Sequence, residues 1–122
     1  MPILDFHLDE RSNFDRVHRI AKGATLPKLQ ARLLDGSTAV DISTATIAFS
    51  MDDEDGVEKV AAQAGAIVGA GTDGTFEYAF AAADVDTEGR FFGQFKVTIS
   101  SDIHLVPNNS VQRLRVEIGP AI

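Results

Sequence analysis

Three carboxylates at alternate positions precede a glycine, and this spacing could bind a divalent cation. They are Asp84, Asp86 and Glu88, and Gly89 follows them. Oxygen ligands at alternate positions before a glycine are typical of the first half of a calcium-binding loop. The twelfth position of such a loop requires a bidentate acid, whereas here it is Phe95. The pattern therefore favours an acidic turn over a metal site, and the three acids stay weak candidates for metal ligands.

A second acidic segment, residues 52–56, reads Asp-Asp-Glu-Asp-Gly and is typical of a hairpin turn. In a two-sheet protein it could lie near Asp84 and Asp86 and add carboxylates to them. Solvated turn acids are the interpretation that we favour for this segment.

The residues that usually carry catalysis are not arranged for it. There is no cysteine, no serine in a Gly-x-Ser-x-Gly turn, and the three histidines are far apart in the sequence. A Gly-x-Gly-x-x-Gly pattern at residues 69–74 precedes an expected strand, so it lacks the helix that binds phosphate. A hydrolase would be the alternative class, but no residue set recommends it. We therefore predict that the protein is not an enzyme and needs no cofactor.

Net charge and hydropathy indicate which kinds of partner the protein could bind. The net charge is −7, which argues against binding nucleic acid, and no apolar run is long enough to span a bilayer. Six of the eleven basic residues lie in the first 32 positions, whereas residues 35–89 contain twelve acids and one base, Lys59. This asymmetry could steer contacts with other proteins or copies, although an uneven solvated surface is the simpler interpretation.

The candidate residues must be positioned by strands, because period-two alternation dominates the chain. Residues 91–99 give the clearest case, with Phe91, Gly93, Phe95, Val97 and Ile99 on one face. We expect similar strands at residues 28–34, 46–51, 75–80 and 111–118, and two short ones between 57 and 68. A helical turn is expected at 81–84. Seven or more short strands at regular spacing predict an all-β sandwich.

The first 15 residues show no clear period and are interpreted as an N-terminal arm. Phe6, Leu8 and Phe14 are apolar and need a partner, so the arm is expected to pack on the domain or on a neighbouring protein. The division predicted is an arm at 1–15 and a single sandwich domain at 16–122. The start of the chain carries no secretory signal, so synthesis in a cytoplasm is expected.

Four segments together resemble a known family. They are Lys-Gly-Ala-Thr-Leu-Pro at 22–27, Leu-Leu-Asp-Gly at 33–36, the strand entry and Phe-Ser-Met strand at 40–51, and Ala-Asp-Val-Asp-Thr-Glu-Gly-Arg-Phe at 83–91. Their order resembles the N-terminal domain of phage baseplate upper proteins, over roughly residues 17 to 118. The sequence departs from that pattern at Ala24, Thr44 and Phe91, where the family has Asp, Gly and Tyr.

This resemblance implies an immunoglobulin-like antiparallel β-sandwich of about seven to nine short strands. It also implies a non-enzymatic virion protein, made in the host bacterial cytoplasm, that docks onto other phage structural proteins and copies of itself. Longer family members carry a fibre or receptor-binding region, and here nothing follows Ile122, so we expect an accessory decoration, neck, tail or baseplate component. The predicted contact residues are Phe6, Leu8, Arg11, Phe14, Arg16 and Arg19. The alternative function is a carbohydrate- or calcium-binding module.

Overall fold

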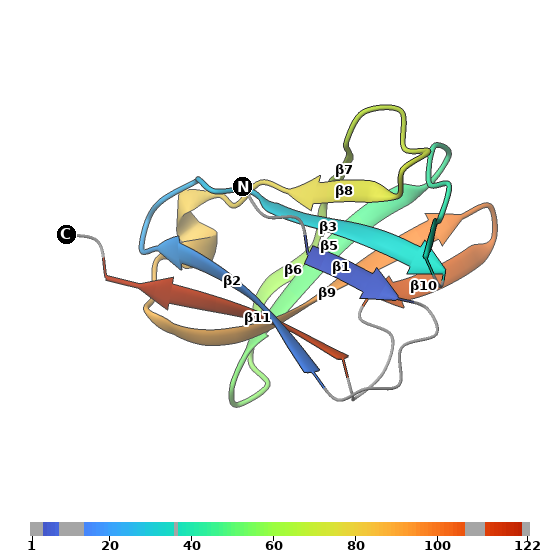
Figure 1. Cartoon of the computed structure of the whole chain (residues 1–122). Coiled ribbons are helices and arrows are strands. Elements are labelled where there is room, and N and C mark those ends of the chain that lie inside the picture. The colour runs from blue at the N-terminus through green and yellow to red at the C-terminus, as the bar shows by residue number, and fades with distance from the viewer. Residues whose placement is uncertain (1–3, 8–13, 36, 107–111, 121–122) are drawn as a thin grey trace.

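The computed structural model describes residues 4–7, 14–35, 37–106 and 112–120, which form two β-sheets packed face to face (Figure 1). The strands are β1 (Leu4–His7), β2 (Phe14–Ala21), β3 (Leu29–Asp35), β4 (Thr38–Ala39), β5 (Thr46–Asp53), β6 (Glu58–Ala64), β7 (Ala66–Ile67), β8 (Thr75–Tyr78), β9 (Gly89–Ile99), β10 (Asp102–Val106) and β11 (Gln112–Gly119). One short 3-10 helix, η1 (Ala82–Val85), precedes β9. The predicted all-β sandwich is confirmed.

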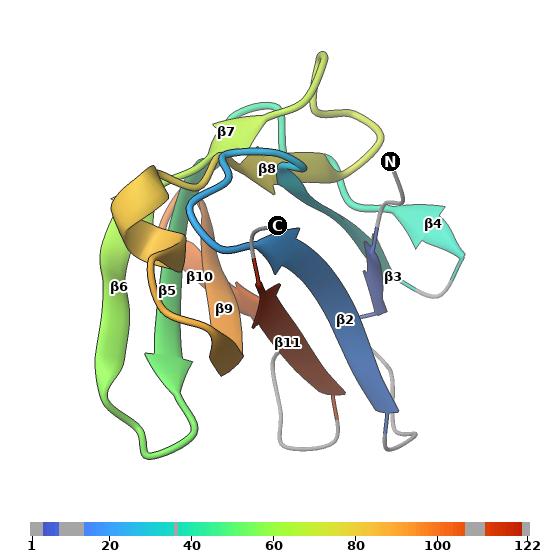
Figure 2. The same cartoon turned by 90° about the vertical axis from the view of Figure 1, so that its left-hand side faces the viewer.

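The two sheets divide the strands unequally. The smaller sheet has the order β1-β3-β8-β7, with β4 beside β3, and the larger has the order β2-β11-β9-β5-β6, with β10 beside β9. Figure 2 shows the two layers from the side, with β8 and β3 over β5, β9 and β11. The two expected strands between residues 57 and 68 are present as β6 and β7. They lie in different sheets, and Gly65 between them packs closely against Ile47.

Strand β9 is the centre of the larger sheet, as its alternation predicted. It pairs antiparallel with β5 along Thr46–Asp53 and with β11 from Leu114 to Ile118. Phe91, Phe95 and Val97 are buried, whereas Gln94 and Lys96 are exposed. A strand hydrogen-bonded on both sides and apolar on one face is fixed in register, because a slip of one residue would expose the apolar set.

Aromatic rings from both sheets meet in the core. Phe49 of β5 stacks on Tyr78 of β8 at 4.7 Å between ring centroids, and Phe95 of β9 contacts Phe76 of β8 at 4.8 Å. Phe80 completes the cluster, 5.2 Å from Tyr78. Rings at these offset and edge-on geometries each bury a large apolar area, so this cluster joins the two sheets.

The described parts of the expected arm at residues 1–15 lie in both sheets. β1 pairs parallel with β3, and β2, which begins at Phe14, pairs parallel with β11. Phe6 is 1% exposed, within the core of its own chain. Of the two partners expected for the arm, the described part of it packs on the domain. The pairing is parallel at both places, so the sheets are mixed rather than wholly antiparallel.

Candidate functional site

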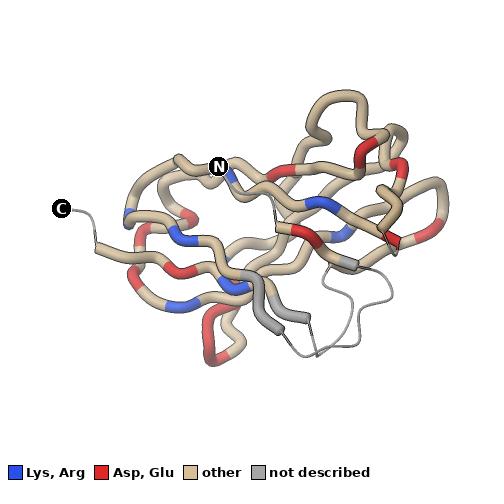
Figure 3. Tube along the Cα trace, in the orientation of Figure 1, with Lys and Arg blue, Asp and Glu red and all other residues tan. Residues whose placement is uncertain are grey.

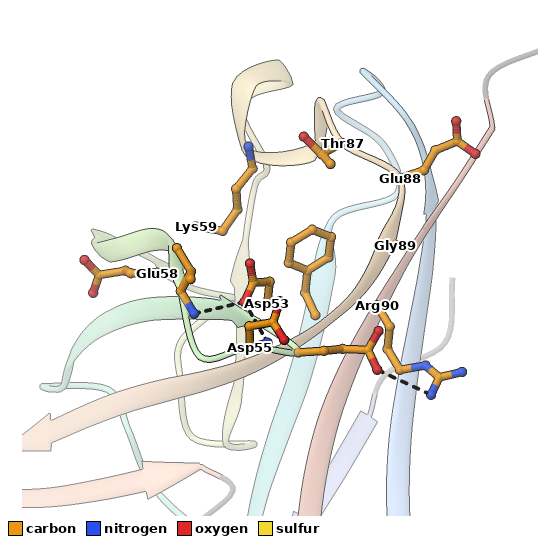
Figure 4. Close-up of a pocket in the computed structure, with 11 residues that line it drawn as sticks. Asp53, Asp55, Glu58, Lys59, Thr87, Glu88, Gly89 and Arg90 are labelled. Atoms are coloured by element: carbon orange, nitrogen blue, oxygen red, sulfur yellow. Dashed lines mark hydrogen bonds and ion pairs between the residues drawn. The ribbon is translucent and has the colours of Figure 1, made fainter.

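The two acidic turns that the sequence singled out meet at one end of the sandwich. The β5–β6 turn and the segment between η1 and β9 line a shallow pocket of about 300 Å³, with Phe91 at its wall. Figure 4 shows Lys59 between the two turns, with Asp53 and Asp55 on one side and Thr87 and Glu88 on the other. Acids outnumber bases among the lining residues, and the bases are Lys59 and Arg90. This end is therefore acidic, and its carboxylates differ in the contacts that they make.

Asp53 holds the β5–β6 turn. Its Oδ1 accepts hydrogen bonds from the backbone N–H groups of Asp55 and Val57, both at 2.9 Å. Aspartate commonly stabilises a turn in this way, by replacing backbone acceptors. Its carboxylate therefore has a structural explanation.

Asp84 is also used within the fold. Its Oδ2 accepts a 2.6 Å hydrogen bond from the Tyr78 hydroxyl and a 2.9 Å bond from the Ala81 N–H. The carboxylate thereby fixes the start of η1 and ties it to β8. Burial, and then the bond to Asp84, raise the pKa of Tyr78 well above its ordinary value.

Asp86 and Glu88 complete the predicted cation set, and they do not join Asp84. Asp86 accepts hydrogen bonds from Lys59 and from the Thr87 hydroxyl, and the bond from Lys59 lowers the pKa of Asp86. Glu88 is exposed. Within the described ranges, no group of three or more His, Asp or Glu side chains could hold a metal ion. Asp84 and Asp86 therefore take part in separate contacts within the fold and Glu88 faces solvent, whereas calcium requires a gathered ligand set.

A row of alternating charges crosses the outer face of the larger sheet near this end. Arg19 of β2 contacts Glu117 of β11 at 3.1 Å, and Arg90 of β9 lies 3.9 Å from both Glu117 and Glu54. Figure 3 shows the alternation of basic and acidic segments across these neighbouring strands. Exposed pairs of this kind contribute little to stability, but they give the surface a defined charge pattern. The charge asymmetry along the sequence did not predict this row, because the charged residues become neighbours only through the pairing register of the strands.

Three of the six basic residues in the first 32 positions, Arg19, Lys28 and Arg32, pair with acids of the fold. Arg32 forms a bidentate pair with Asp5, at 2.9 Å for both bonds, and Lys28 lies 3.3 Å from Glu77. These pairs lie on the outer face of the smaller sheet. The charges of these three basic residues are therefore compensated locally in the folded domain.

The six predicted contact residues fall into four groups. Phe6 is buried in the core, so its side chain is not available to a partner in this conformation. Leu8 and Arg11 lie outside the described residues, and Phe14 and Arg16 are described as backbone positions of β2. Arg19 is exposed on β2, with 74% of its side chain accessible. The contact role of this set remains a prediction.

Exposed apolar side chains occur where the sequence did not single them out. Ile103 and Leu105 of β10 are 55% and 43% exposed, and Leu26 is 64% exposed. The β10 pair alternates with half-buried His104 and buried Val106. The sequence held one signal for this patch, namely that apolar residues occupy both faces of the strand. A strand with one face in solvent normally has polar residues on that face.

The structure describes the side chains of two histidines, His18 and His104, which lie on different strands. His18 is buried, its ring stacks 5.8 Å from that of Phe80, and its Nε2 lies 3.2 Å from the carbonyl oxygen of Pro27. Burial lowers the pKa of His18. His104 lies on another strand, half-buried. The neutral ring of His18 fills a place in the core between β2 and Phe80.

Comparison with known proteins supports the fold. No family model matches the sequence, and no curated protein matches it. Among solved structures, the N-terminal domain of phage TP901-1 ORF48 matches with a TM-score of 0.60 at 12% sequence identity, covering 96% of each chain. The chain has the fold of this phage domain. The resemblance to a phage domain that the sequence motifs suggested is thus confirmed at the level of the fold.

No helix in the described part of the chain is long and apolar enough to cross a membrane.

Proposed function

We propose that the protein is a structural component of a phage virion and acts by docking onto other virion proteins. The observation that carries this proposal is the likeness to the ORF48 domain over 96% of both chains. A likeness that covers 96% of both chains means that nearly the entire domain, rather than one motif, follows the phage architecture. The sequence motifs between residues 22 and 91 point to the same group of proteins independently.

The surface of the domain is consistent with docking. Its acidic end has an open, shallow pocket and exposed charged pairs. Enzyme and small-ligand sites are usually concave and largely apolar. Complementary charge instead contributes to the specificity and rate of protein association. The mechanism proposed is therefore surface complementarity within a symmetric assembly.

The proposal is tested by asking whether the protein is built into particles. The gene is deleted from the phage, and the protein is supplied in trans with an epitope tag at its C-terminus. Particles are then purified by density-gradient centrifugation and probed for the tag. We expect the tag to sediment with intact particles at a fixed ratio to the major capsid protein. A tagged protein found only at the top of the gradient, beside complete particles, would remove the proposal.

A matched variant separates docking from mere trapping in the particle. Replacement of Glu54 and Glu88 by glutamine neutralises two exposed acids at the acidic end and keeps side-chain size. Replacement of Gln63 by glutamate on β6 serves as a control, since it changes an exposed residue of another surface. If the acidic end docks, the first variant lowers the incorporated ratio and the control leaves it unchanged.

A further inference from the structure

Two exposed apolar residues lie on the outer face of the larger sheet. Ile103 and Leu105 are two positions apart in β10, so their side chains point to the same face, and they are 55% and 43% exposed. Single exposed apolar residues are normal on a protein surface, but the outer face of a solvated sheet usually carries polar residues. Adjacent exposed apolar residues on such a face are typical of a contact surface.

This apolar pair lies beside a lysine that has no partner in its own chain. Strand register places Lys96 of β9 between Leu105 of β10 and Ala48 of β5, and in the next row Ile103 lies beside Thr98. Lys96 is exposed and makes no ion pair with any residue that the structure describes. We refer to these residues as the β10 patch: Lys96, Thr98, Ile103 and Leu105. A protein that covers the patch should supply an apolar side chain together with a carboxylate.

The β5–β6 turn has this complementary composition. Val57 is 62% exposed in the turn, and Asp55 and Glu58 on either side of it are exposed as well. Within the described ranges, neither of these two carboxylates forms an ion pair. We refer to Asp55, Val57 and Glu58 as the turn surface. It presents one apolar side chain between two carboxylates.

The β10 patch and the turn surface lie at opposite ends of the same strands. β5 begins at Thr46, which pairs with Thr98 of the patch, and ends at Asp53, where the turn begins. Figure 1 shows the β9–β10 hairpin and the β5–β6 turn at opposite ends of the larger sheet. Complementary surfaces at opposite ends of one molecule can join its copies end to end. Because both halves of the contact are present on one chain, the partner that they specify is a second copy.

We propose that the turn surface of one copy docks on the β10 patch of the next copy, in a head-to-tail contact. Val57 would pack against Ile103 and Leu105 of the neighbour, and a carboxylate of the turn would pair with its Lys96. Burial of these exposed apolar side chains favours association, and the charge pair fixes which surfaces meet.

The charges favour this contact over a two-fold one. A two-fold contact through the patch would set Lys96 against Lys96 of the second copy, and one through the turn would set carboxylates against carboxylates. Like charges facing each other across an interface are unfavourable. The head-to-tail contact pairs opposite charges and leaves one patch and one turn free at its two ends. When repeated, such a contact forms a ring if the rotation closes and a filament if it does not.

This inference rests on the proposed function and deepens it, because it names a second copy as one partner in the assembly. Its test uses purified protein alone. Failure of the test therefore leaves incorporation into particles untouched, and failed incorporation leaves the association of copies measurable.

The experiment is sedimentation equilibrium of the full chain from micromolar to millimolar concentration. The salt concentration is about 0.15 M, at which repulsion between distant charges of the two copies is screened. We expect a mass that rises past the dimer of the 13.1 kDa chain, because each added copy presents a free surface.

Two variants each remove one half of the contact. The patch variant combines Lys96→Gln with Leu105→Ser, and the turn variant combines Val57→Ser with Glu58→Gln. Each variant alone should associate about tenfold or more weakly than the wild type. Lys22→Gln with Leu26→Ser is the matched control, since it makes the same two kinds of change at exposed positions of the loop after β2. The control should associate like the wild type.

Mixing the two variants tests the head-to-tail geometry itself. The patch variant keeps its turn and the turn variant keeps its patch, so the mixture has one productive contact and should form a one-to-one dimer that grows no further. This dimer would also show that both variants are folded. A wild-type chain that stays monomeric at millimolar concentration overturns the proposal, and so does association that stops at a dimer. Variants that associate like the control, or a mixture that fails to form the dimer, overturn it as well.

Discussion

The Tyr78 hydroxyl and Asp84 Oδ2 lie 2.6 Å apart and join β8 to the turn that leads into β9. The two residues are six positions apart in the sequence, and their hydrogen bond anchors η1 next to the acidic turn. Tyr78 itself is 5% exposed and stacks on Phe49, so the hydroxyl reaches the carboxylate from within the core. A charge-assisted bond of this kind is among the stronger hydrogen bonds of a small domain.

The Tyr78–Asp84 bond makes a spectroscopic prediction. Tyr78 is the one tyrosine of the chain, and there is no tryptophan, so phenolate absorbance reports on this group alone. Because burial and Asp84 raise the pKa of Tyr78, we expect the folded protein to titrate above the ordinary value of about 10. The folded state then binds the proton more tightly than the unfolded state, and stability falls as pH rises above about 10. Asp84→Asn should move the titration downward; a wild-type midpoint near 10 would contradict the buried bond.

Gly93 provides a test of the packing between β9 and β5. A Cβ at this position would lie 2.7 Å from Cε1 of Phe49 and 3.4 Å from Leu114. We expect Gly93→Ala to lower the free energy of unfolding by about 1–3 kcal/mol, because the ring cannot move without disturbing the aromatic core. Urea denaturation measures this. Gly119→Ala is the control, since its Cβ would meet nothing within 4 Å; equal effects of the two changes would refute the close approach.

Phe6 tests whether β1 is part of the domain. It is 1% exposed and belongs to the core cluster, so Phe6→Ala should lower the free energy of unfolding by about 3–5 kcal/mol. Leu26→Ala, at a 64% exposed position, should change it by less than about 0.5 kcal/mol. Thermal and urea melts of the two variants compare them directly. A Phe6→Ala protein as stable as the Leu26→Ala protein would show that the N-terminal segment is a separable arm.

His18 should make stability depend on pH. Burial lowers the pKa of His18 from its ordinary value of 6.5, so the unfolded state binds a proton that the folded state resists. Stability is therefore full above pH 6.5 and decreases as pH falls below it. His18→Gln can still donate to the Pro27 carbonyl but does not titrate. We expect a flatter stability profile for this variant between pH 6.5 and about 5; an unchanged slope would assign the effect to other groups.

Much of the larger sheet could be predicted from the sequence. The inward sets Ile47, Phe49 and Met51 of β5, and Leu114, Val116 and Ile118 of β11, are buried as their alternation indicated. The turn at residues 81–84 is present as η1. Alternation predicts these strands correctly because one face of each packs in the core and the other faces solvent.

The N-terminal region and the charge contacts could not be predicted in the same way. β1 is four residues long, too short to show a period, and its partner β3 is more than twenty residues away. Parallel pairing leaves no hairpin signal in the sequence. The Arg19–Glu117 contact joins residues 98 positions apart, so the strand order alone decides it. The sequence suggested that the two acidic turns could lie close together. It could not show that Asp53 and Asp84 accept hydrogen bonds from groups of their own domain, because those contacts depend on the folded geometry.

The measurement that tests the central claim most directly is the presence of the protein in purified phage particles. Quantitative mass spectrometry of gradient-purified wild-type particles would give its copy number relative to the major capsid protein. We predict a fixed, reproducible ratio that survives a second gradient and disappears when the gene is deleted. A protein absent from such particles, or removed by the second gradient, would contradict the assignment to the virion.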